Sequence, residues 1–467
     1  MNSPAQQINL SDAFIEHALS VEFDDFPQAV IERAHQRLAD ALGNIAAGTQ
    51  AEGMSDLVDL VTHWGGVPEA TVLANGTLIP AHNAAMINAA LMRSFDFEPV
   101  GAEGPEQRQV PAHITGTTVP VALAVAEARG SSGRDMLTAL LVGEDIAARL
   151  AFGSGFDVYS GQDNTGTVNG VGAVFIAGLL MGLTQDQLRH ALGIVVNQLA
   201  GSVGSIFDGA ATFKLPMSFA ARNAIISCEM AQVGMTGQRD PLSGMFGFLD
   251  SFCADPKAEL MIKDLGRVFY ADAVIKPWSA CRASHPSLDA AVRLVENHGV
   301  RAQDVEKVTV HVTPRTKAGF VGKPFAPGPN AEVSAAFSIH FAVATALLHG
   351  TVRPEFLGPQ AASDPHLQDL LERTEIEASL APEEVLTAEV EVLLKDGTTV
   401  HQRVADPRGD IYTAPLSREQ VLQKFRANLR LGGQASQQRQ NQLLNAIETI
   451  ESAADVQNLI RLAVLPS

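Results

Sequence analysis

The spacing of apolar residues changes once along this 467-residue chain, near residue 273, and that change limits the fold more than any other feature. Before it, apolar side chains recur every three or four residues, as in segment 26–49, which is typical of amphipathic helices. We expect further helices, rich in alanine, over segments 54–63, 80–95, 119–128, 134–150, 167–183, 185–205 and 214–233. Ser132 is the expected cap of the fourth of these. Nothing before about residue 270 calls for a sheet.

After the change, apolar and polar residues alternate. The sequence VEKVTVHV at 305–312 predicts a half-buried strand. A second strand is expected over 388–394, and the Asp-Gly pair at 396–397 predicts a tight hairpin into a third strand over 398–404. A helix is expected over 331–349, between the first two strands.

The predicted fold is therefore mainly α. A large all-helical bundle domain comprises residues 1–272 and, after an interruption, residues 406–467. An inserted, smaller α+β lid domain comprises residues 273–405. The segment 415–464 is helical again and is expected to return to the bundle. An insertion of this kind predicts a cleft at the boundary, beside Lys276.

Composition excludes several classes of function. Acidic residues outnumber basic ones by 52 to 33, giving a formal charge of −19, so we expect no nucleic-acid partner and no anionic membrane surface as partner. The uncharged segment 164–185 fits a buried helix better than a membrane span. Three scattered cysteines give neither a disulfide framework nor zinc spacing, and no signal peptide is evident. A cytoplasmic location is the expectation.

The stretch KPWSACRASHPSLDAA at 276–291 concentrates chemistry at the start of a helix. Its reactive or charged side chains are Lys276, Cys281, Arg282 and His285. Ser284 is the expected N-cap and Pro286 fits the first turn, where exposed N–H groups favour an anion. A capped surface helix explains the same residues equally well. Cys281 with His285 could form a nucleophile and base, but no third group to orient them is visible, so Cys281 is interpreted as a packing residue.

A second cluster lies between two predicted helices, in segment 94–127. Asp96, Glu98 and His113 occur there in a long loop rich in glycine and proline, and such loops are commonly functional. On the residues alone, a helix-terminal carboxylate and a surface histidine remain equally open. Lys214 stands alone in an apolar run, where it either extends to the surface or points into a cleft. No glycine-rich phosphate loop is present, so no nucleotide cofactor is implied.

Eight segments occur in a fixed order along the chain: RLADALGNIAAGT, ATVLANGTLIPAHNAAMINAAL, SFDFE, HITGTTVPVALAVAE, FKLPMSFAARNAI, GMTGQRDPLSGMFGFLDSF, KPWSACRASHPSLDAA and PRGDIYTAPLS. In their order and number these segments resemble the MmgE/PrpD family, which includes 2-methylcitrate dehydratase, cis-aconitate decarboxylase and iminodisuccinate epimerase. The resemblance implies an active site between a helical domain and an α+β lid, no cofactor or metal, and a homodimer.

The family's site residues carry over unevenly. Positions that match the family pattern are Asp96, His113, Lys214, Lys276, Arg282 and His285, and Glu98 takes the place of a second acid. Three positions depart from it. Arg93 and Asp163 stand where the family usually has histidines, and Phe320 stands where the decarboxylase has a tyrosine.

Together these observations predict a positively lined cleft for a small anionic polycarboxylate. Lys214, Lys276 and Arg282 would hold carboxylates, and Arg93 and Asp163 are also expected to line the substrate site. His113, oriented by Asp96, is the expected general base. His285 is the expected acid and Lys214 part of the catalytic set.

The predicted activity is abstraction of a proton next to a carboxylate, as in a dehydratase-type lyase. Epimerisation of an amino- or imino-dicarboxylate by two-base proton transfer stays open. So does a metabolite-binding homologue without activity, which the changes at Arg93 and Asp163 would permit.

Overall fold

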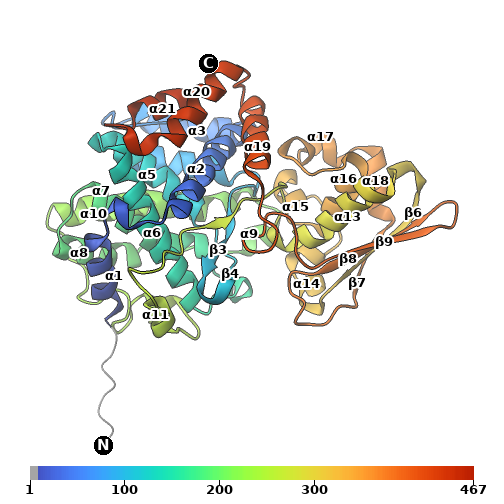
Figure 1. Ribbon diagram of the computed structural model, residues 1–467, viewed down its shortest axis with the longest axis horizontal. Coiled ribbons are helices and arrows are strands. Elements are labelled where there is room, and N and C mark those ends of the chain that lie inside the picture. Colours follow the sequence, from blue (N-terminus) through green and yellow to red (C-terminus); the bar gives the residue numbers. More distant parts are fainter. Residues whose placement is uncertain (1–8, 467) are drawn as a thin grey trace, which may run out of the picture.

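The computed structural model describes residues 9–466. Figure 1 shows most helices gathered on one side and a smaller part of helices and strands on the other. The principal helices of the larger part are α1 (Leu10–Ser20), α2 (Gln28–Gly48), α3 (Met54–Trp64), α4 (Ala81–Arg93), α5 (Thr115–Arg129), α6 (Gly133–Gly153), α7 (Val168–Leu180), α8 (Gln185–Val196), α10 (Leu215–Gln232), α19 (Arg418–Leu431), α20 (Gln437–Glu448) and α21 (Gln457–Ala463). A mainly α fold is thus confirmed.

The predicted helices occur close to their expected ranges. Ser132 caps α6 by accepting a hydrogen bond from the backbone N–H of Asp135. The helix expected over 185–205 is interrupted, because α8 ends at Val196 and only the short α9 (Gly204–Phe207) follows. None of the helices within residues 9–466 is both long and apolar enough to cross a membrane.

Small residues let the helices approach closely. A Cβ added at Gly143 of α6 would lie 2.7 Å from the carbonyl oxygen of Gly172 in α7. A Cβ at Gly48 of α2 would lie 1.9 Å from the carbonyl oxygen of Leu91 in α4. Only glycine fits at such backbone contacts. The second contact fixes the end of α4, which carries Arg93.

The expectation that no sheet precedes residue 270 was wrong. Strands β1 (Ala70–Thr71) and β2 (Leu78–Ile79) pair, and β3 (Val100–Gly104) and β4 (Arg108–Val110) form an antiparallel hairpin. The short β5 (Ala273–Val274) joins the other edge of β3. These strands are too short to show an alternating pattern in the sequence, and β3 also contains glycine.

The hairpin explains how residues 98 and 113 come together. Ala102 pairs with Val110 at the open end of the hairpin, so residue 98 precedes it and residue 113 follows it at the same end. Antiparallel partners lie about 5 Å apart. The segment predicted as a loop therefore forms a hairpin that places Glu98 beside His113.

The smaller part contains a four-stranded sheet in the order β7-β6-β8-β9. Its strands are β6 (Val305–Val312), β7 (Thr374–Ala378), β8 (Ala388–Leu394) and β9 (Thr399–Val404). The predicted hairpin of β8 and β9 is confirmed. Helix α13 (His285–His298) packs on β8 and β9, and α16 (Ile339–His349) packs on α13. The helix expected over 331–349 is divided into α15 (Ala331–Ala336) and α16, because Ser338 is extended and caps α16.

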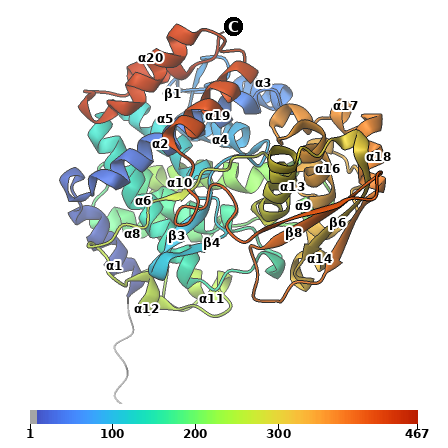
Figure 2. The ribbon, with the colours of Figure 1, turned by 45° about the vertical axis from the view of Figure 1, so that its right-hand side comes forward.

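The start of α13 differs from the prediction. Ser284 lies in a short 3-10 turn, Arg282–Ser284, and its side chain makes no capping hydrogen bond. Pro286 does occupy the first turn. After the sheet, the chain returns to the larger part through α19, which packs on α2. In Figure 2, α19 lies above the β3–β4 hairpin and between the two parts. The division at residues 273 and 405 remains a prediction.

Candidate active site

Four charged or titratable side chains meet where α4 ends and the β3–β4 hairpin begins. Arg93 is the last residue of α4, and its Nη1 donates to Asp96 Oδ1 at 2.7 Å and to Glu98 Oε1. The same nitrogen lies 2.9 Å from His113 Nδ1, which lies 2.6 Å from Glu98 Oε1. Arg93, Asp96 and Glu98 are buried, whereas the His113 side chain keeps 15% of its surface exposed. His113 is the most exposed member of this cluster.

Glu98, not Asp96, orients the histidine. Because an ionised carboxylate accepts and does not donate, the 2.6 Å contact with Glu98 places the proton on Nδ1 of His113, and the 2.9 Å approach of Arg93 Nη1 to that nitrogen is then not a hydrogen bond. Nε2 then has a free lone pair, and no residue among those described bonds to it. The expectation that Asp96 orients His113 is corrected, because the carboxylate of Asp96 contacts Arg93 and Lys276.

The charges around His113 keep the pair in a useful protonation state. Burial, and then the positive charge of Arg93, lower the pKa of His113, while Glu98 acts in the opposite direction. Burial by itself would raise the pKa of Glu98, but Arg93 and His113 outweigh it and hold that pKa well below its usual range. At neutral pH the pair is an ionised carboxylate and a neutral imidazole, which is the state of a general base.

Lys276 supports the cluster from the segment after β5. Its fully buried ammonium lies 2.9 Å from Asp96 Oδ2 and donates to the backbone oxygen of Asp96 at 2.5 Å. Asp96 has φ of 48°, in the left-handed region that residues other than glycine rarely adopt. Lys276 was expected to bind a substrate carboxylate. The structure instead engages its ammonium with Asp96.

Lys214 is the cation with the fewest partners near this cluster. It precedes α10 and is buried, and its Nζ has no hydrogen-bond partner within residues 9–466. Glu332 Oε2, from α15, lies 4.0 Å away. Burial lowers the pKa of Lys214, and the charge of Glu332 opposes that shift. A buried ammonium without hydrogen bonds is costly unless an anion satisfies it.

Packing joins the first turn of α10 to the Glu98–His113 pair. A Cβ at Gly116 would lie 2.2 Å from Met217 Sδ and 3.5 Å from Glu98 Cγ. Phe213, next to Lys214, has its ring 4.9 Å from the Arg93 guanidinium carbon. The sequence-predicted residues Arg93, Asp96, His113, Lys214 and Lys276 are thus brought to one region.

Arg282 and His285 form a neighbouring pair. Arg282 Nη1 donates to the carbonyl oxygen of Arg408 at 3.2 Å, and Nη2 lies 3.5 Å from Asp410 Oδ2. Its Nε and Nη2 make no hydrogen bond to any described residue. Burial lowers the pKa of Arg282 to about 10, so the guanidinium stays charged and can receive a carboxylate.

His285 does not suit the acid role predicted for it. Its side chain is fully buried, Nε2 lies 3.1 Å from the carbonyl oxygen of Ala280, and Nδ1 lies 3.4 Å from Arg282 Nη1. Burial, followed by the charges of Arg282 and Lys276, places the pKa of His285 well below 6.5. A neutral imidazole with both nitrogens engaged is not a proton donor to a ligand. We interpret His285 as a support for Arg282.

Asp163 lies within the electrostatic range of Arg93. It caps the turn Asn164–Gly166 by accepting from Thr165 N–H at 2.9 Å. Burial would lower the pKa of Arg93, but Glu98, Asp96 and Asp163 raise it. A carboxylate at this place stabilises Arg93 and would repel a substrate carboxylate. Direct substrate binding by Asp163, as first expected, is therefore not favoured by its charge.

Phe320 belongs to an aromatic cluster. Its ring centroid lies 5.7 Å from those of Tyr159 and Phe337, and 5.6 Å from that of Phe207. Phe337 in turn lies 5.5 Å from Phe213, the ring beneath Arg93. Phe207, Phe320 and Phe337 border a cavity of about 180 Å³. Apolar surface thus extends from Phe213 toward Phe320.

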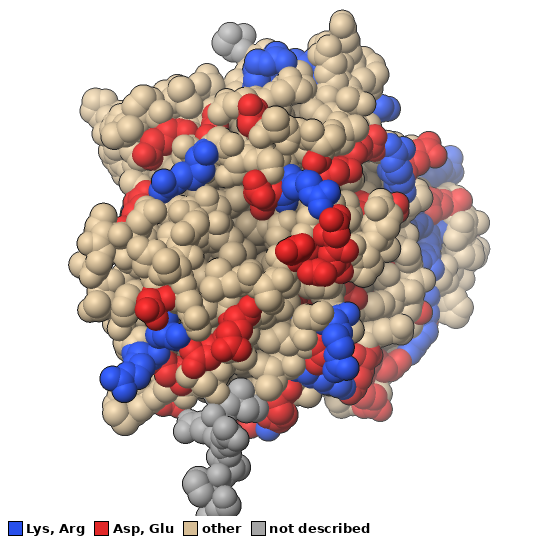
Figure 3. Space-filling model, turned by 60° about the vertical axis from the view of Figure 1, so that its left-hand side comes forward, with Lys and Arg blue, Asp and Glu red and all other residues tan. Residues whose placement is uncertain are grey.

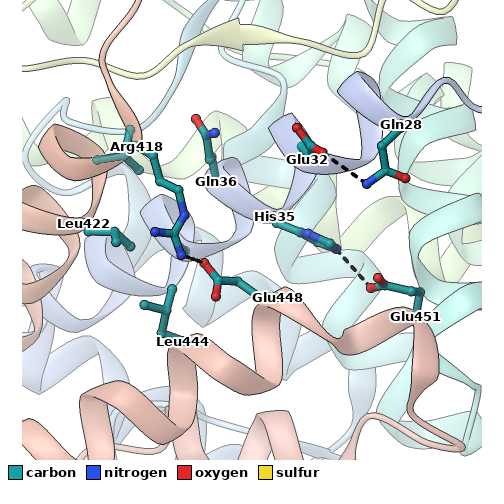
Figure 4. Close-up of a pocket in the computed structure, with 11 residues that line it drawn as sticks. Gln28, Glu32, His35, Gln36, Arg418, Leu422, Leu444, Glu448 and Glu451 are labelled. Atoms are coloured by element: carbon teal, nitrogen blue, oxygen red, sulfur yellow. Dashed lines mark hydrogen bonds and ion pairs between the residues drawn. The ribbon is translucent and has the colours of Figure 1, made fainter.

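A separate pocket on the surface is an alternative candidate for the binding site. A pocket of about 320 Å³ lies between α2, α19 and α20 (Figure 4). His35 points to Glu451 at 3.1 Å, and Arg418 points to Glu448. Its charged groups largely satisfy one another, and it contains none of the predicted site residues. On the face in Figure 3, Lys and Arg form separate groups beside Asp and Glu, without a continuous basic surface.

The cluster resembles a metal site but already holds a cation. Ligand atoms of Asp96, Glu98 and His113 all lie within 4.8 Å of one another. Arg93 Nη1 contacts each of these three groups. A divalent ion there would have to displace or closely approach a guanidinium, at high electrostatic cost. The donor set therefore fits Arg93 better than a metal.

Two supporting residues were missed from the sequence. Glu332 faces Lys214, and Lys424 of α19 donates to the carbonyl oxygen of Phe97 at 2.7 Å. Glu332 is an acid in an otherwise apolar helix, and Lys424 begins a Lys-Phe pair in the C-terminal segment. A charged residue within an apolar helical face was the available signal in both cases.

Two family models and several named relatives match most of this chain. The MmgE/PrpD N-terminal domain family matches residues 12–261, and the MmgE/PrpD C-terminal domain family matches residues 278–449. A cis-aconitate decarboxylase-like protein, oryM, of Aspergillus oryzae (strain ATCC 42149 / RIB 40) is 23% identical over 466 residues, which cover 94% of each chain. Cis-aconitate decarboxylase of Aspergillus terreus (strain NIH 2624 / FGSC A1156) is 22% identical over 486 residues, covering 96% of this chain and 94% of that protein.

Proposed function

The chain belongs to the MmgE/PrpD family, and from that premise we propose that it is a cofactor-independent lyase acting on a small di- or tricarboxylate by proton transfer next to a carboxylate. The observation that carries this proposal is the His113–Glu98 pair, with the buried ammonium of Lys214, which makes no hydrogen bond within residues 9–466, in the same region. The relatives with decarboxylase names support the lyase class. Epimerisation has no comparable support.

In the proposed reaction the substrate is held by the cations that lack full partners. Lys214 binds one carboxylate as a point charge, and Arg282 binds another through its free N–H groups. Neutralising these charges makes the adjacent carbon more acidic. His113 Nε2 removes the proton, while Glu98 stabilises the imidazolium that forms.

A hydroxyl on the next carbon would leave as water, taking the proton that His113 has just removed, and an unsaturated product would form. The proton donor is not assigned to His285, for the reasons given above. Decarboxylation is the second candidate, and the names of the relatives are the observation that favours it. In that reaction the electron pair left by carbon dioxide is protonated, and His113, which is neutral at rest, would first take that proton from solvent and then deliver it to the carbon.

A substrate panel tests the proposal. The protein would be incubated with citrate, 2-methylcitrate, cis-aconitate and amino-dicarboxylates. Carbon dioxide release would report decarboxylation, and far-ultraviolet absorbance would report dehydration. Deuterium appearing in recovered substrate without other change would indicate an epimerase. Binding without turnover of any member would favour an inactive homologue. If the protein neither bound nor converted any member, the proposed substrate class would be contradicted.

Three expectations accompany this proposal. We propose that residues 273–405 act as a lid over the cluster, that the protein is a homodimer, and that it works in the cytoplasm. Sedimentation velocity would report the number of subunits. Small-angle scattering with and without ligand would report lid closure.

A further inference from the structure

Lys424 contacts the segment that carries Asp96 and Glu98. From α19 its Nζ donates to the carbonyl oxygen of Phe97 at 2.7 Å, and it lies 2.7 Å from Asp40 Oδ1. It also lies 3.7 Å from the centroid of the Phe97 ring. Phe97 stands between Asp96 and Glu98 in the sequence. The ammonium therefore holds the peptide that joins the two carboxylates.

A buried polar network fixes Lys424 in turn. Asp40 Oδ2 accepts from Asn44 Nδ2 at 2.9 Å, and Asn44 Oδ1 accepts from Asn428 Nδ2 at 2.9 Å. Asn44 Nδ2 also lies 3.4 Å from the carbonyl oxygen of Phe97. Asp40, Asn44, Lys424 and Asn428 are all buried. Helices α2 and α19 are thereby joined to the segment 96–98.

Stability alone is a weak explanation for this pair. Replacing a buried ion pair with apolar residues is often neutral or stabilising. Burial lowers the pKa of Lys424 to about 8, with Asp40 opposing that shift, so the charged form is maintained at a cost. The directional contact with Phe97 is something an apolar side chain could not supply.

We infer that Lys424 is a positioning residue, which fixes the carbonyl of Phe97 and thereby holds Glu98 against Nδ1 of His113. The inference rests on the proposed function, because it assigns Lys424 a part in activating the base. It requires no contact between Lys424 and the substrate.

The titration of His113 separates this role from a structural one. In a Lys424→Met variant, loss of a nearby positive charge would by itself move the His113 titration to higher pH. Displacement of Glu98 would move it to lower pH, because Glu98 raises the pKa of His113. The double variant Asp40→Asn/Lys424→Met removes one charge of each sign, so the direct electrostatic effects of the two changes on the pKa of His113 largely cancel. It also avoids leaving the buried Asp40 carboxylate unpaired.

The experiment measures the His113 titration by NMR in the unliganded full-length protein, with the resonance assigned by a His113→Gln variant. In the double variant we expect the titration to move to lower pH and kcat/KM to fall about 100-fold, mostly in kcat, as expected for a small misplacement of a catalytic group. Lys424→Arg should restore part of both. Arg353→Met, which removes a charge from the same 190 Å³ cavity that Lys424 lines, is the matched control and should change neither.

If the double variant folds and His113 titrates at an unchanged or higher pH, the inference is wrong. Because that measurement needs no substrate, it remains decisive if the proposed reaction itself fails on the whole panel. A lowered titration without any turnover would support the positioning role and contradict the proposed function.

Discussion

Glu98→Gln is the substitution that most directly tests the His113–Glu98 pair. It keeps the size of the side chain and removes its charge. Glu98 Oε1 accepts from Arg93 and from His113 Nδ1, and hydrogen bonds to charged groups contribute about 1.5–3 kcal/mol each. Removing one partner of a buried ion pair costs about 3–5 kcal/mol, so we expect the free energy of unfolding to fall by about that amount.

The effect on activity has two separable parts. Loss of Glu98 leaves burial and Arg93 to lower the pKa of His113 without opposition, so the acid limb of kcat/KM should move to lower pH. The plateau at neutral pH should nevertheless fall by about 10²–10⁴, the usual contribution of a general base. A lower plateau together with a limb at lower pH shows that the histidine is still neutral but no longer oriented.

The assay is kcat/KM against pH on the member of the panel that turns over, with urea unfolding in parallel. Glu103→Gln is the matched control, because Glu103 lies in the same hairpin and hydrogen-bonds Tyr412. Its kcat/KM should stay within about twofold of wild type, far less than the loss expected for a general base. If Glu98→Gln kept more than half of the wild-type kcat/KM while remaining folded, the assignment of Glu98 would be wrong.

Three further predictions follow from the same contacts. Lys214→Met should weaken binding of the anionic substrate by about 10–100-fold, measured by calorimetry, because a charged hydrogen bond contributes about 1.5–3 kcal/mol. Little loss of binding would exclude Lys214 as a carboxylate anchor. Prolonged dialysis against EDTA should leave kcat unchanged, because Arg93 Nη1 fills the centre of the acidic cluster; lost activity restored by a divalent metal would contradict this. Burial raises the pKa of Glu103 to about 7, so the folded state binds more protons than the unfolded state between about pH 4.5 and 7, and stability should fall as pH rises through that window. Urea unfolding should show a weaker decline in Glu103→Gln, and an unchanged slope would contradict the shift.

Helices were predictable because a buried face repeats every three or four residues, and the β8–β9 hairpin because its strands alternate around Asp396-Gly397. The β3–β4 hairpin could not be predicted, because its strands are short and β3 contains glycine. Because the hairpin was not predicted, the carboxylate that orients His113 was wrongly identified as Asp96. Asp96 and Glu98 are equivalent in the sequence, and only the hairpin register and the left-handed Asp96 turn one of them toward His113.

Burial decided the role of His285 in the same way. Its neighbours in sequence made it a candidate acid, but the sequence does not show that the imidazole is enclosed against Ala280 and Arg282. The pairing of Lys214 with Glu332 depends on a contact between distant segments, which periodicity cannot reveal. Residue types were thus predictable where local pattern sufficed, and their roles were not where tertiary contact decided them.

Arg93 connects these findings. Where the family resemblance leads one to expect a histidine, this chain has a guanidinium that contacts Asp96, Glu98 and His113 together. A histidine could titrate and exchange protons with a substrate, whereas arginine remains charged at all working pH values. The substitution therefore replaces a second proton carrier with a fixed positive charge. Two-base epimerisation loses a candidate base by this change, while a one-base lyase gains a cation that keeps Glu98 ionised and His113 neutral. That asymmetry is the physical reason to favour the lyase over the epimerase for this chain.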